Sequence, residues 1–97
     1  MSQVGFDWDP GKDLENQAKH GVAFAEAQYA FADPHRVIAE DCSHSTRSEK
    51  RYYCFGLVGG GILTVRFVFR GEQIRIIGAG YWRKGKRTYE QANQIHE

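Results

Sequence analysis

The sequence is poor in the features that mark membrane and secreted proteins. No apolar run approaches the roughly 18 residues that a membrane-spanning helix needs, and the N-terminal segment lacks the basic and apolar regions of a signal peptide. The two cysteines, Cys42 and Cys54, are too few for a secreted disulfide framework. We therefore expect a cytoplasmic protein with no membrane partner, in which both thiols stay reduced.

Motifs for metals and nucleotides are also missing. Cys42, His44 and Cys54 offer thiol and imidazole ligands, but a Cys-x-His pair with one remote cysteine lacks the repeated spacing of structural zinc sites. The glycine-rich stretches 59–61 and 78–80 do not continue into a phosphate-binding nucleotide motif. The sequence thus predicts neither a metal nor a cofactor.

What is present suffices for one folded domain. The chain has 97 residues, of which 41% are hydrophobic and 26% charged, and six Phe, five Tyr and two Trp supply the bulk of a core. A chain of this length buries roughly 60–70% of the surface that it exposes when unfolded. We predict a single domain over residues 1–97 and exclude both a second domain and a disordered chain.

The formal net charge of +1 hides an uneven distribution. Between residues 66 and 87, seven basic residues stand against the single acid Glu72, whereas the rest of the chain has six basic and eleven acidic residues. The seven are Arg66, Arg70, Arg75, Arg83, Lys84, Lys86 and Arg87. Such a segment is typical of a surface that binds nucleic acid, phosphate or an acidic protein, and a solvated basic face is the alternative.

Periodicity predicts an α+β fold in the order β-α-α-β-β-β-β-α. We expect strands at 6–8, 37–39, 52–58, 62–70 and 73–77, and helices at 12–20, 24–32 and 84–95. Gly21 ends the first helix, and Gly85 weakens the start of the last. The expected architecture is a mainly antiparallel sheet, largely a meander, packed against an αα-hairpin and a C-terminal helix.

A two-residue turn at Gly71 and Glu72 fixes the register of the last hairpin. It pairs Phe69 with Ile74, Phe67 with Ile76, Val68 with Arg75 and Arg66 with Ile77. Alternation then places Leu63, Val65, Phe67 and Phe69 on the face covered by helices. Arg66 and Arg75 become diagonal neighbours on the other face, with Arg70 at its edge. An anion between these cations would relieve their repulsion, and neutralisation by Glu49 or another acid is the alternative.

Several short motifs in a fixed order resemble the BrnT-like toxins of bacterial type II toxin–antitoxin systems. They are FDWDP at 6–10, KHGV at 19–22 with Phe24, Glu26 and Ala27, FADP at 31–34, His44 and Ser45 with Glu49 and Arg51, and IRII at 74–77 with Ala79. The resemblance covers nearly the whole chain. It implies a compact RelE-like ribonuclease that is neutralised by a ribbon-helix-helix antitoxin, and operator DNA is then contacted only through that antitoxin. A homodimer and a heterotetramer with the antitoxin are both open.

The chain departs from the family pattern at two positions. Gly78 and Gly80 stand where many members have Ser and Arg, so that a hydroxyl and a guanidinium are missing. The basic residues after Gly80 can restore the positive charge, and Trp82 can stack on a base, pack in the core or face a partner. The departure bears on catalytic strength more than on the fold.

The resemblance implies metal-independent cleavage, in which the RNA 2′-hydroxyl attacks phosphorus with the help of an acid, a base and cations. Candidates for this chemistry are Lys19, His20, Glu49, Arg51, Arg66 and Arg75, and candidates for RNA binding are Arg70, Trp82, Arg83, Lys84 and Lys86. Each has a structural alternative. His20, before the capping Gly21, can form a structural hydrogen bond, and Glu49 and Arg51 can form a salt bridge. Tyr89 is a packing residue more often than a proton donor. His44, in a polar loop, is a further candidate for proton transfer, and an idle exposed ring is its default alternative.

Two other functions compete with a ribonuclease toxin. The residues at positions 78 and 80 would fit a catalytically weakened homologue that serves as a binding module for an antitoxin or a nucleic acid. The basic segment alone would also fit a nucleic-acid-binding regulator without toxicity. A gene for a small ribbon-helix-helix protein beside this one would favour the toxin.

Overall fold

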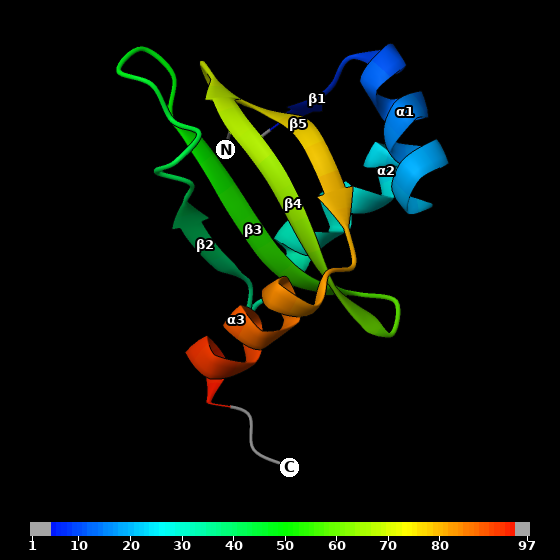
Figure 1. Ribbon diagram of the computed structural model, residues 1–97, viewed down its shortest axis with the longest axis vertical. Helices are drawn as coiled ribbons and strands as arrows, with labels where there is room; N and C mark the ends of the chain where they lie inside the picture. Colours follow the sequence, from blue (N-terminus) through cyan, green and yellow to red (C-terminus); the bar gives the residue numbers. More distant parts are fainter. Residues whose placement is uncertain (1–4, 95–97) are drawn as a thin grey trace.

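The computed structural model describes residues 5–94 and confirms the α+β fold and the predicted order of its elements (Figure 1). The elements are β1 (Gly5–Asp7), α1 (Pro10–His20), α2 (Phe24–Ala27), the 3₁₀ helix η1 (Gln28–Ala32), β2 (Val37–Glu40), β3 (Arg51–Val58), β4 (Gly61–Arg70), β5 (Gln73–Gly80) and α3 (Arg83–Asn93). The predicted end of the last helix, Ile95, lies outside the described residues. Within them, no helix is long and apolar enough to cross a membrane.

Five strands form one sheet in the order β1-β5-β4-β3-β2. Strands β2 to β5 make the expected antiparallel meander. The first strand, β1, lies at the edge of the sheet next to β5. It runs parallel to β5 and pairs Phe6 with Ile74. The first strand of the chain is thereby joined to the last.

The first helix begins and ends at the residues that its sequence indicates. The Asp9 side chain accepts a hydrogen bond from the Lys12 N–H at 2.9 Å and so caps the N-terminus, with Pro10 in the first turn. At the other end Gly21 adopts a left-handed conformation with φ of 69°, and its N–H bonds to the Gln17 carbonyl. The helix is therefore defined locally, before any contact with the sheet.

The segment predicted as one helix over 24–32 is instead a single turn of α2 followed by η1. Its buried residues Phe24, Ala27 and Ala30 are three apart, which is the period of a 3₁₀ helix. The segment also lies so close to β3 that a Cβ atom on Gly56 would overlap the Ala30 carbonyl. Close packing on the sheet thus favours the tighter helix.

The core lies between the sheet and the α2–η1 segment. Leu63, Val65 and Phe67 project from one face of β4 into it, as alternation predicts, and all three are buried. Phe69 continues this row but is 54% exposed, because α2 and η1 do not extend over that end of the strand. We call the face of the sheet that packs on α2 and η1 the first face. The opposite face, which carries Thr64, is the second face.

The last hairpin confirms the predicted pairs of Phe69 with Ile74, Val68 with Arg75 and Phe67 with Ile76. The predicted pair of Arg66 with Ile77 is wrong, because a bulge shifts the register between Arg66 and Phe67 and places Arg66 opposite Gly78. A bulge adds one residue to one strand and bends it. Beyond the bulge, β5 continues to Gly80, three residues past its predicted end.

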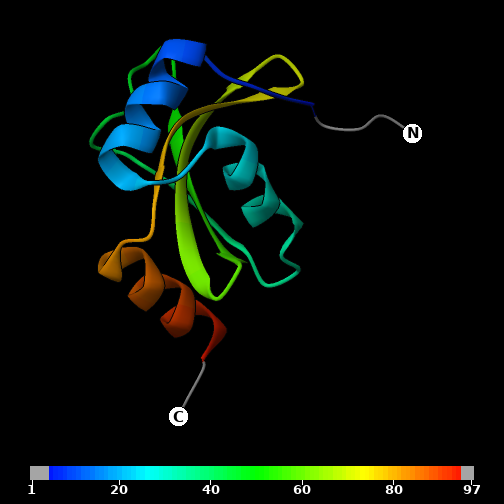
Figure 2. The same cartoon turned by 90° about the vertical axis from the view of Figure 1, so that its right-hand side faces the viewer.

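The third helix packs on the second face of the sheet, on the same side as α1, whereas α2 and η1 lie on the other side (Figure 2). A Cβ atom on Gly85 would overlap Thr64, so only glycine allows this approach. The Tyr89 hydroxyl donates a 2.7 Å hydrogen bond to the Asp33 carboxylate, which also accepts one from the Leu57 N–H. Gly85 lowers the helix propensity of this segment, but it also allows α3 to pack closely on the sheet.

Candidate active site

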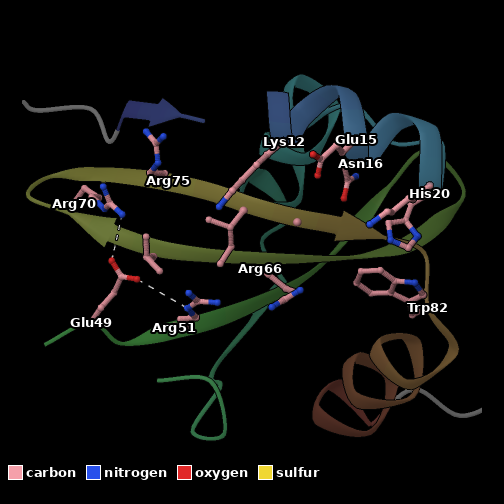
Figure 3. Close-up of a pocket in the computed structure, with 14 residues that line it drawn as sticks. Lys12, Glu15, Asn16, His20, Glu49, Arg51, Arg66, Arg70, Arg75 and Trp82 are labelled. Atoms are coloured by element: carbon pink, nitrogen blue, oxygen red, sulfur yellow. Dashed lines mark hydrogen bonds and ion pairs between the residues drawn. The ribbon is translucent and has the colours of Figure 1, made fainter. Parts of the chain in front are cut away.

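A cleft of about 380 Å³ opens between α1 and the second face of the sheet (Figure 3). Its walls come from α1, from β3, β4 and β5, and from the residues that precede β3 and follow β5. The lining residues are Lys12, Glu15, Asn16, Lys19, His20, Glu49, Arg51, Arg66, Val68, Arg70, Arg75, Ile77, Gly78 and Trp82. Six cationic side chains therefore face two carboxylates, and the cleft attracts anions.

The cleft unites residues that the sequence analysis selected separately. All six candidates for catalysis line it, together with Arg70 and Trp82 from the set proposed to bind RNA. The other three of that set, Arg83, Lys84 and Lys86, lie on α3 and outside this cleft. The basic segment is thus divided between the sheet and the helix that follows it.

One face of α1 forms a wall of the cleft, and Asn16 fixes its position. The buried Asn16 side chain donates 2.9 Å hydrogen bonds to the carbonyls of Val22 and Ala79 and accepts one of 3.2 Å from the Ala79 N–H. An amide that satisfies both backbone groups of a strand residue holds the helix at one height on β5. Lys12 and Lys19, on the same helix face, are thereby aimed at the cleft.

Arg66 lies in the middle of the cleft and is its least neutralised arginine (Figure 3). Within residues 5–94 it forms no ion pair, and the same holds for Lys12 and Lys19. Guanidinium groups keep their charge at all accessible pH values and bind phosphate through two parallel hydrogen bonds. A half-buried guanidinium without a carboxylate partner is suited to an anionic ligand.

Glu49 holds two arginines at one end of the cleft. Its carboxylate lies 3.3 Å from the Arg70 guanidinium and 3.9 Å from that of Arg51. The backbone there is set by Thr46, whose hydroxyl accepts a hydrogen bond from the Glu49 N–H. The salt bridge that the spacing of Glu49 and Arg51 suggests is present, and Glu49 also faces the cleft.

Arg75 is neutralised by an acid, although not by the one named from the sequence. Its guanidinium lies 3.2 Å from the Asp7 carboxylate, which β1 brings alongside through its parallel pairing with β5. Arg75 still lines the cleft. Of the two arginines expected to share an anion, Arg66 is therefore the one that lacks a protein partner among the described residues.

His20 stands at the opposite end of the cleft from Glu49 (Figure 3). Its ring is exposed and makes no hydrogen bond within the described part of the chain, and it meets the Trp82 ring edge to face at a centroid distance of 5.1 Å. The structural hydrogen bond considered for His20 is thus not formed there, and the Gly21 N–H makes the predicted helix cap. The imidazole can therefore bond to a ligand in the cleft.

The two glycines that depart from the family pattern differ in the space around them. A Cβ atom on Gly78 would make an ordinary contact of 3.6 Å with the Arg66 side chain, so a serine fits there. A Cβ atom on Gly80 would lie 2.5 Å from the Trp82 ring, which is closer than side chains approach. In this chain the indole occupies the place of a side chain at position 80.

His44 lies outside the cleft and is held by a buried acid. Its Nδ1 atom is 2.8 Å from the Asp41 carboxylate, which also accepts a bond from the Ser43 hydroxyl. Burial raises the pKa of the Asp41 carboxyl, but the bonds from Ser43, His44 and Tyr53 outweigh it and leave the pKa below its ordinary value. The His44 ring is thus exposed, as expected, but a charged neighbour fixes its orientation.

The sequence analysis missed Lys12, Glu15 and Asn16. A signal was available, because positions 12, 15, 16, 19 and 20 have the spacing of one helix face and share it with the two residues that were selected. The role of Asn16 had no such signal, since its partner Ala79 is 63 residues away. Among residues 5–94, no group of three or more His, Cys, Asp and Glu side chains gathers as metal ligands.

One comparison with known proteins identifies a family for this chain. The family model described as the ribonuclease toxin BrnT of type II toxin–antitoxin systems matches residues 8–85. No curated protein matches the chain. The matched stretch runs from the residue after β1 to the first turn of α3 and includes every residue that lines the cleft.

Proposed function

Because this chain belongs to the BrnT family of ribonuclease toxins from type II toxin–antitoxin systems, we propose that it cuts RNA in the cleft between α1 and the sheet. The observation that carries this proposal is a set of three cations, Lys12, Lys19 and Arg66, that form no ion pair within residues 5–94. They line one cleft together with His20 and Glu49. A phosphodiester in contact with Arg66 would supply the missing negative charge.

The proposed reaction uses the nucleophile that RNA itself contains. A base removes the proton of a 2′-hydroxyl, and the oxygen attacks the adjacent phosphorus. The bond from phosphorus to the 5′-oxygen then breaks, and an acid protonates the leaving oxygen. The products are a 2′,3′-cyclic phosphate and a 5′-hydroxyl. Negative charge grows on the phosphoryl oxygens in between, where Arg66, Lys12 and Lys19 would stabilise it.

We assign the two proton transfers to Glu49 as the base and His20 as the acid. The attacking and leaving oxygens stand on opposite sides of phosphorus, so the two groups are needed on opposite sides of the phosphate. Glu49 and His20 lie at the two ends of the cleft with Arg66 between them (Figure 3). Arg51, Arg70 and Arg75 have carboxylate partners and would position the RNA chain. This scheme requires no metal and no cofactor.

A type II system implies an antitoxin that binds the toxin. We propose a ribbon-helix-helix antitoxin that places carboxylates over the cleft and so blocks access of RNA, with operator DNA contacted only through the antitoxin. Support comes from the charge of the cleft, where six cationic side chains face two acidic ones. Retention of full RNA cleavage in the purified toxin–antitoxin complex would contradict occlusion of the cleft.

Cleavage by the purified protein tests the mechanism. An RNA oligonucleotide should be cut in the presence of EDTA to give a 2′,3′-cyclic phosphate, and 2′-deoxy substitution at the scissile nucleotide should abolish cleavage. Glu49→Gln and His20→Gln should each reduce the rate about 10²–10⁴-fold. Glu72→Gln and His35→Gln, at exposed positions outside the cleft, are the matched controls and should retain the wild-type rate.

Three outcomes separate this proposal from its alternatives. Sensitivity to EDTA would refute the metal-independent mechanism and leave the toxin function standing. RNA that binds without being cut would favour a catalytically weakened binding module, the alternative raised by Gly78 and Gly80. Normal growth of cells that accumulate the protein without its antitoxin would refute toxicity.

A further inference from the structure

A second cavity, of about 440 Å³, adjoins the cleft and shares Arg66 and Trp82 with it. It lies between α3 and the second face of the sheet. Its walls are largely apolar and aromatic, and Tyr53 and Phe55 stack there at a centroid distance of 5.6 Å and an interplanar angle of 27°. The cavity is thus unlike the cleft beside it, whose walls are charged.

A few polar side chains also line this cavity. His44 lines it with a ring that Asp41 holds at Nδ1, so that Nε2 is the nitrogen left for a ligand. Lys84 and Thr88 add a cation and a hydroxyl from α3. An aromatic, mostly apolar space with a few fixed polar groups suits a flat heterocycle that has hydrogen-bonding edges.

Arg66 and Trp82 connect this second cavity to the cleft in which the scissile phosphate is proposed to bind. A nucleotide carries its base and its phosphate on one ribose, so it needs an anion site and an apolar site that adjoin. Arg66 belongs to both cavities, and Trp82 stands at their boundary, where the absence of a side chain at Gly80 makes room for its ring. The two cavities together have the layout of a nucleotide site.

We propose that this second cavity is a nucleobase subsite, which receives the base of a nucleotide next to the scissile phosphate while Arg66 contacts that phosphate. The inference rests on the proposed cleavage of RNA in the cleft, which it deepens by naming the part of the substrate that is recognised. Stacking on the aromatic walls accepts any base, and the polar edge at His44, Lys84 and Thr88 then selects among bases.

Binding of mononucleotides tests the subsite without any cleavage. Adenosine, guanosine, cytidine and uridine 5′-monophosphates are titrated into the isotope-labelled full chain, with ribose 5-phosphate as the control that lacks a base. The nucleotides should shift the backbone amide signals of Tyr53, Lys84 and Thr88 and the indole N–H signal of Trp82. Ribose 5-phosphate should shift only signals of the cleft, such as Lys12.

Two results of this titration would overturn the proposal. Ribose 5-phosphate that shifts the signals of the second cavity as strongly as the nucleotides would show that the base is not recognised. Nucleotides that shift only cleft signals would place the base elsewhere. Cleavage of RNA without nucleotide shifts in the cavity refutes the subsite alone, whereas nucleotide shifts without cleavage of RNA refute the proposed function alone.

A filled cavity provides the second test. Thr88→Phe places a ring in the space proposed for the base, and Gln91→Phe places the same ring on the exposed side of α3 as the matched control. Wild type and Gln91→Phe should cut intact RNA about tenfold or more faster than RNA with an abasic nucleotide beside the scissile bond. Thr88→Phe should bring this ratio close to one. An unchanged ratio in a folded Thr88→Phe protein would refute the subsite.

Discussion

The Arg75 guanidinium donates a hydrogen bond of 3.2 Å to the Asp7 carboxylate and so ties the last strand of the sheet to the first. The second oxygen of Asp7 is buried and has no hydrogen-bond partner among the described residues. Asp7 therefore depends on Arg75 for neutralisation. The pair gives Arg75 a structural role in addition to its place in the cleft.

Arg75→Ala should lower the free energy of unfolding by about 1 kcal/mol, because a partly exposed ion pair is lost and the Asp7 charge stays behind. Asp7→Asn and the double variant complete a thermodynamic cycle, measured by urea denaturation. The double variant should be less destabilised than the sum of the single variants. Strict additivity would show that the two side chains are not coupled.

Arg66→Ala, unlike Arg75→Ala, should reduce cleavage of RNA and leave the stability of the fold nearly unchanged. Cleavage should fall about 10²–10³-fold, because contacts with the transition state are lost. The free energy of unfolding should change by less than about 0.5 kcal/mol, because the residue forms no ion pair within the described residues. Arg66→Lys keeps the charge, loses the planar fork and should still cleave poorly. Arg47→Ala, at an exposed loop arginine outside both cavities, is the control for charge.

Tyr89→Phe should destabilise the fold by about 1.5–3 kcal/mol and leave cleavage of RNA by the folded protein intact, because it removes a hydrogen bond to the buried Asp33 carboxylate. Urea denaturation at pH 7 measures the loss. Tyr29→Phe, at an exposed tyrosine, is the matched control and should have no effect. Equal stability of the two variants would show that the bond between Tyr89 and Asp33 contributes nothing.

The stabilising effect of Tyr89 should depend on pH. Burial and the bond to Asp33 raise the pKa of the Tyr89 hydroxyl to about 12, above the ordinary value of 10. A group whose pKa rises on folding stabilises the fold below its ordinary pKa and loses this effect as the pH rises toward the folded value. The stability gap between wild type and Tyr89→Phe should therefore narrow between pH 10 and 12. The buried Cys54 thiol, whose pKa burial also raises to about 12, is common to both proteins and cancels in the comparison.

Asp33 should make the fold sensitive to acid. Burial raises the pKa of its carboxyl, but hydrogen bonds from the Leu57 N–H, the Tyr89 hydroxyl and the His35 N–H outweigh burial and bring the pKa below the ordinary 3.8. Its contribution is present above pH 3.8 and is lost as the pH falls further. Asp33→Asn should therefore lower the free energy of unfolding at pH 7 and flatten its decline below pH 3.8, as measured by urea denaturation across that range.

Gly85→Ala should destabilise the protein by about 1–3 kcal/mol, because the new Cβ atom meets Thr64 and Phe55 and pushes α3 off the sheet. Helix propensity alone would give the opposite sign, since alanine stabilises helix interiors by about 1 kcal/mol over glycine. Thr64→Ala removes the nearest obstacle and should recover part of the loss in the double variant. A Gly85→Ala protein that melts at a higher temperature than wild type would show that propensity prevails over packing.

Strand alternation and turn chemistry made much of the fold predictable. The pairs Phe69 with Ile74 and Phe67 with Ile76 follow from the two-residue turn and the period of a strand. The bulge at Arg66 does not, because no local pattern signals an extra residue in β5. The parallel pairing of β1 with β5 was also missed, since a three-residue strand has too little sequence to indicate its neighbour.

The residue types of the candidate site could be predicted from the sequence, but the contacts between these residues could not. Arginines, a histidine and a glutamate were selected by residue type, and they meet in one cleft. Which of them are neutralised depends on contacts between distant segments, such as Arg75 with Asp7. Which of Arg66 and Arg75 lacks a carboxylate partner among the described residues could therefore be seen only in the three-dimensional structure.

The bonds from Asn16 to Ala79 bear on when this protein can act during its own synthesis. They join the first helix to the last strand, 63 residues later, and the parallel pairing of β1 with β5 spans a similar separation. A ribosome has therefore translated the chain as far as Ala79 before the cleft can close. A nascent or prematurely terminated chain that ends before β5 lacks the wall on which α1 rests. A fragment of this kind should therefore lack the proposed ribonuclease activity.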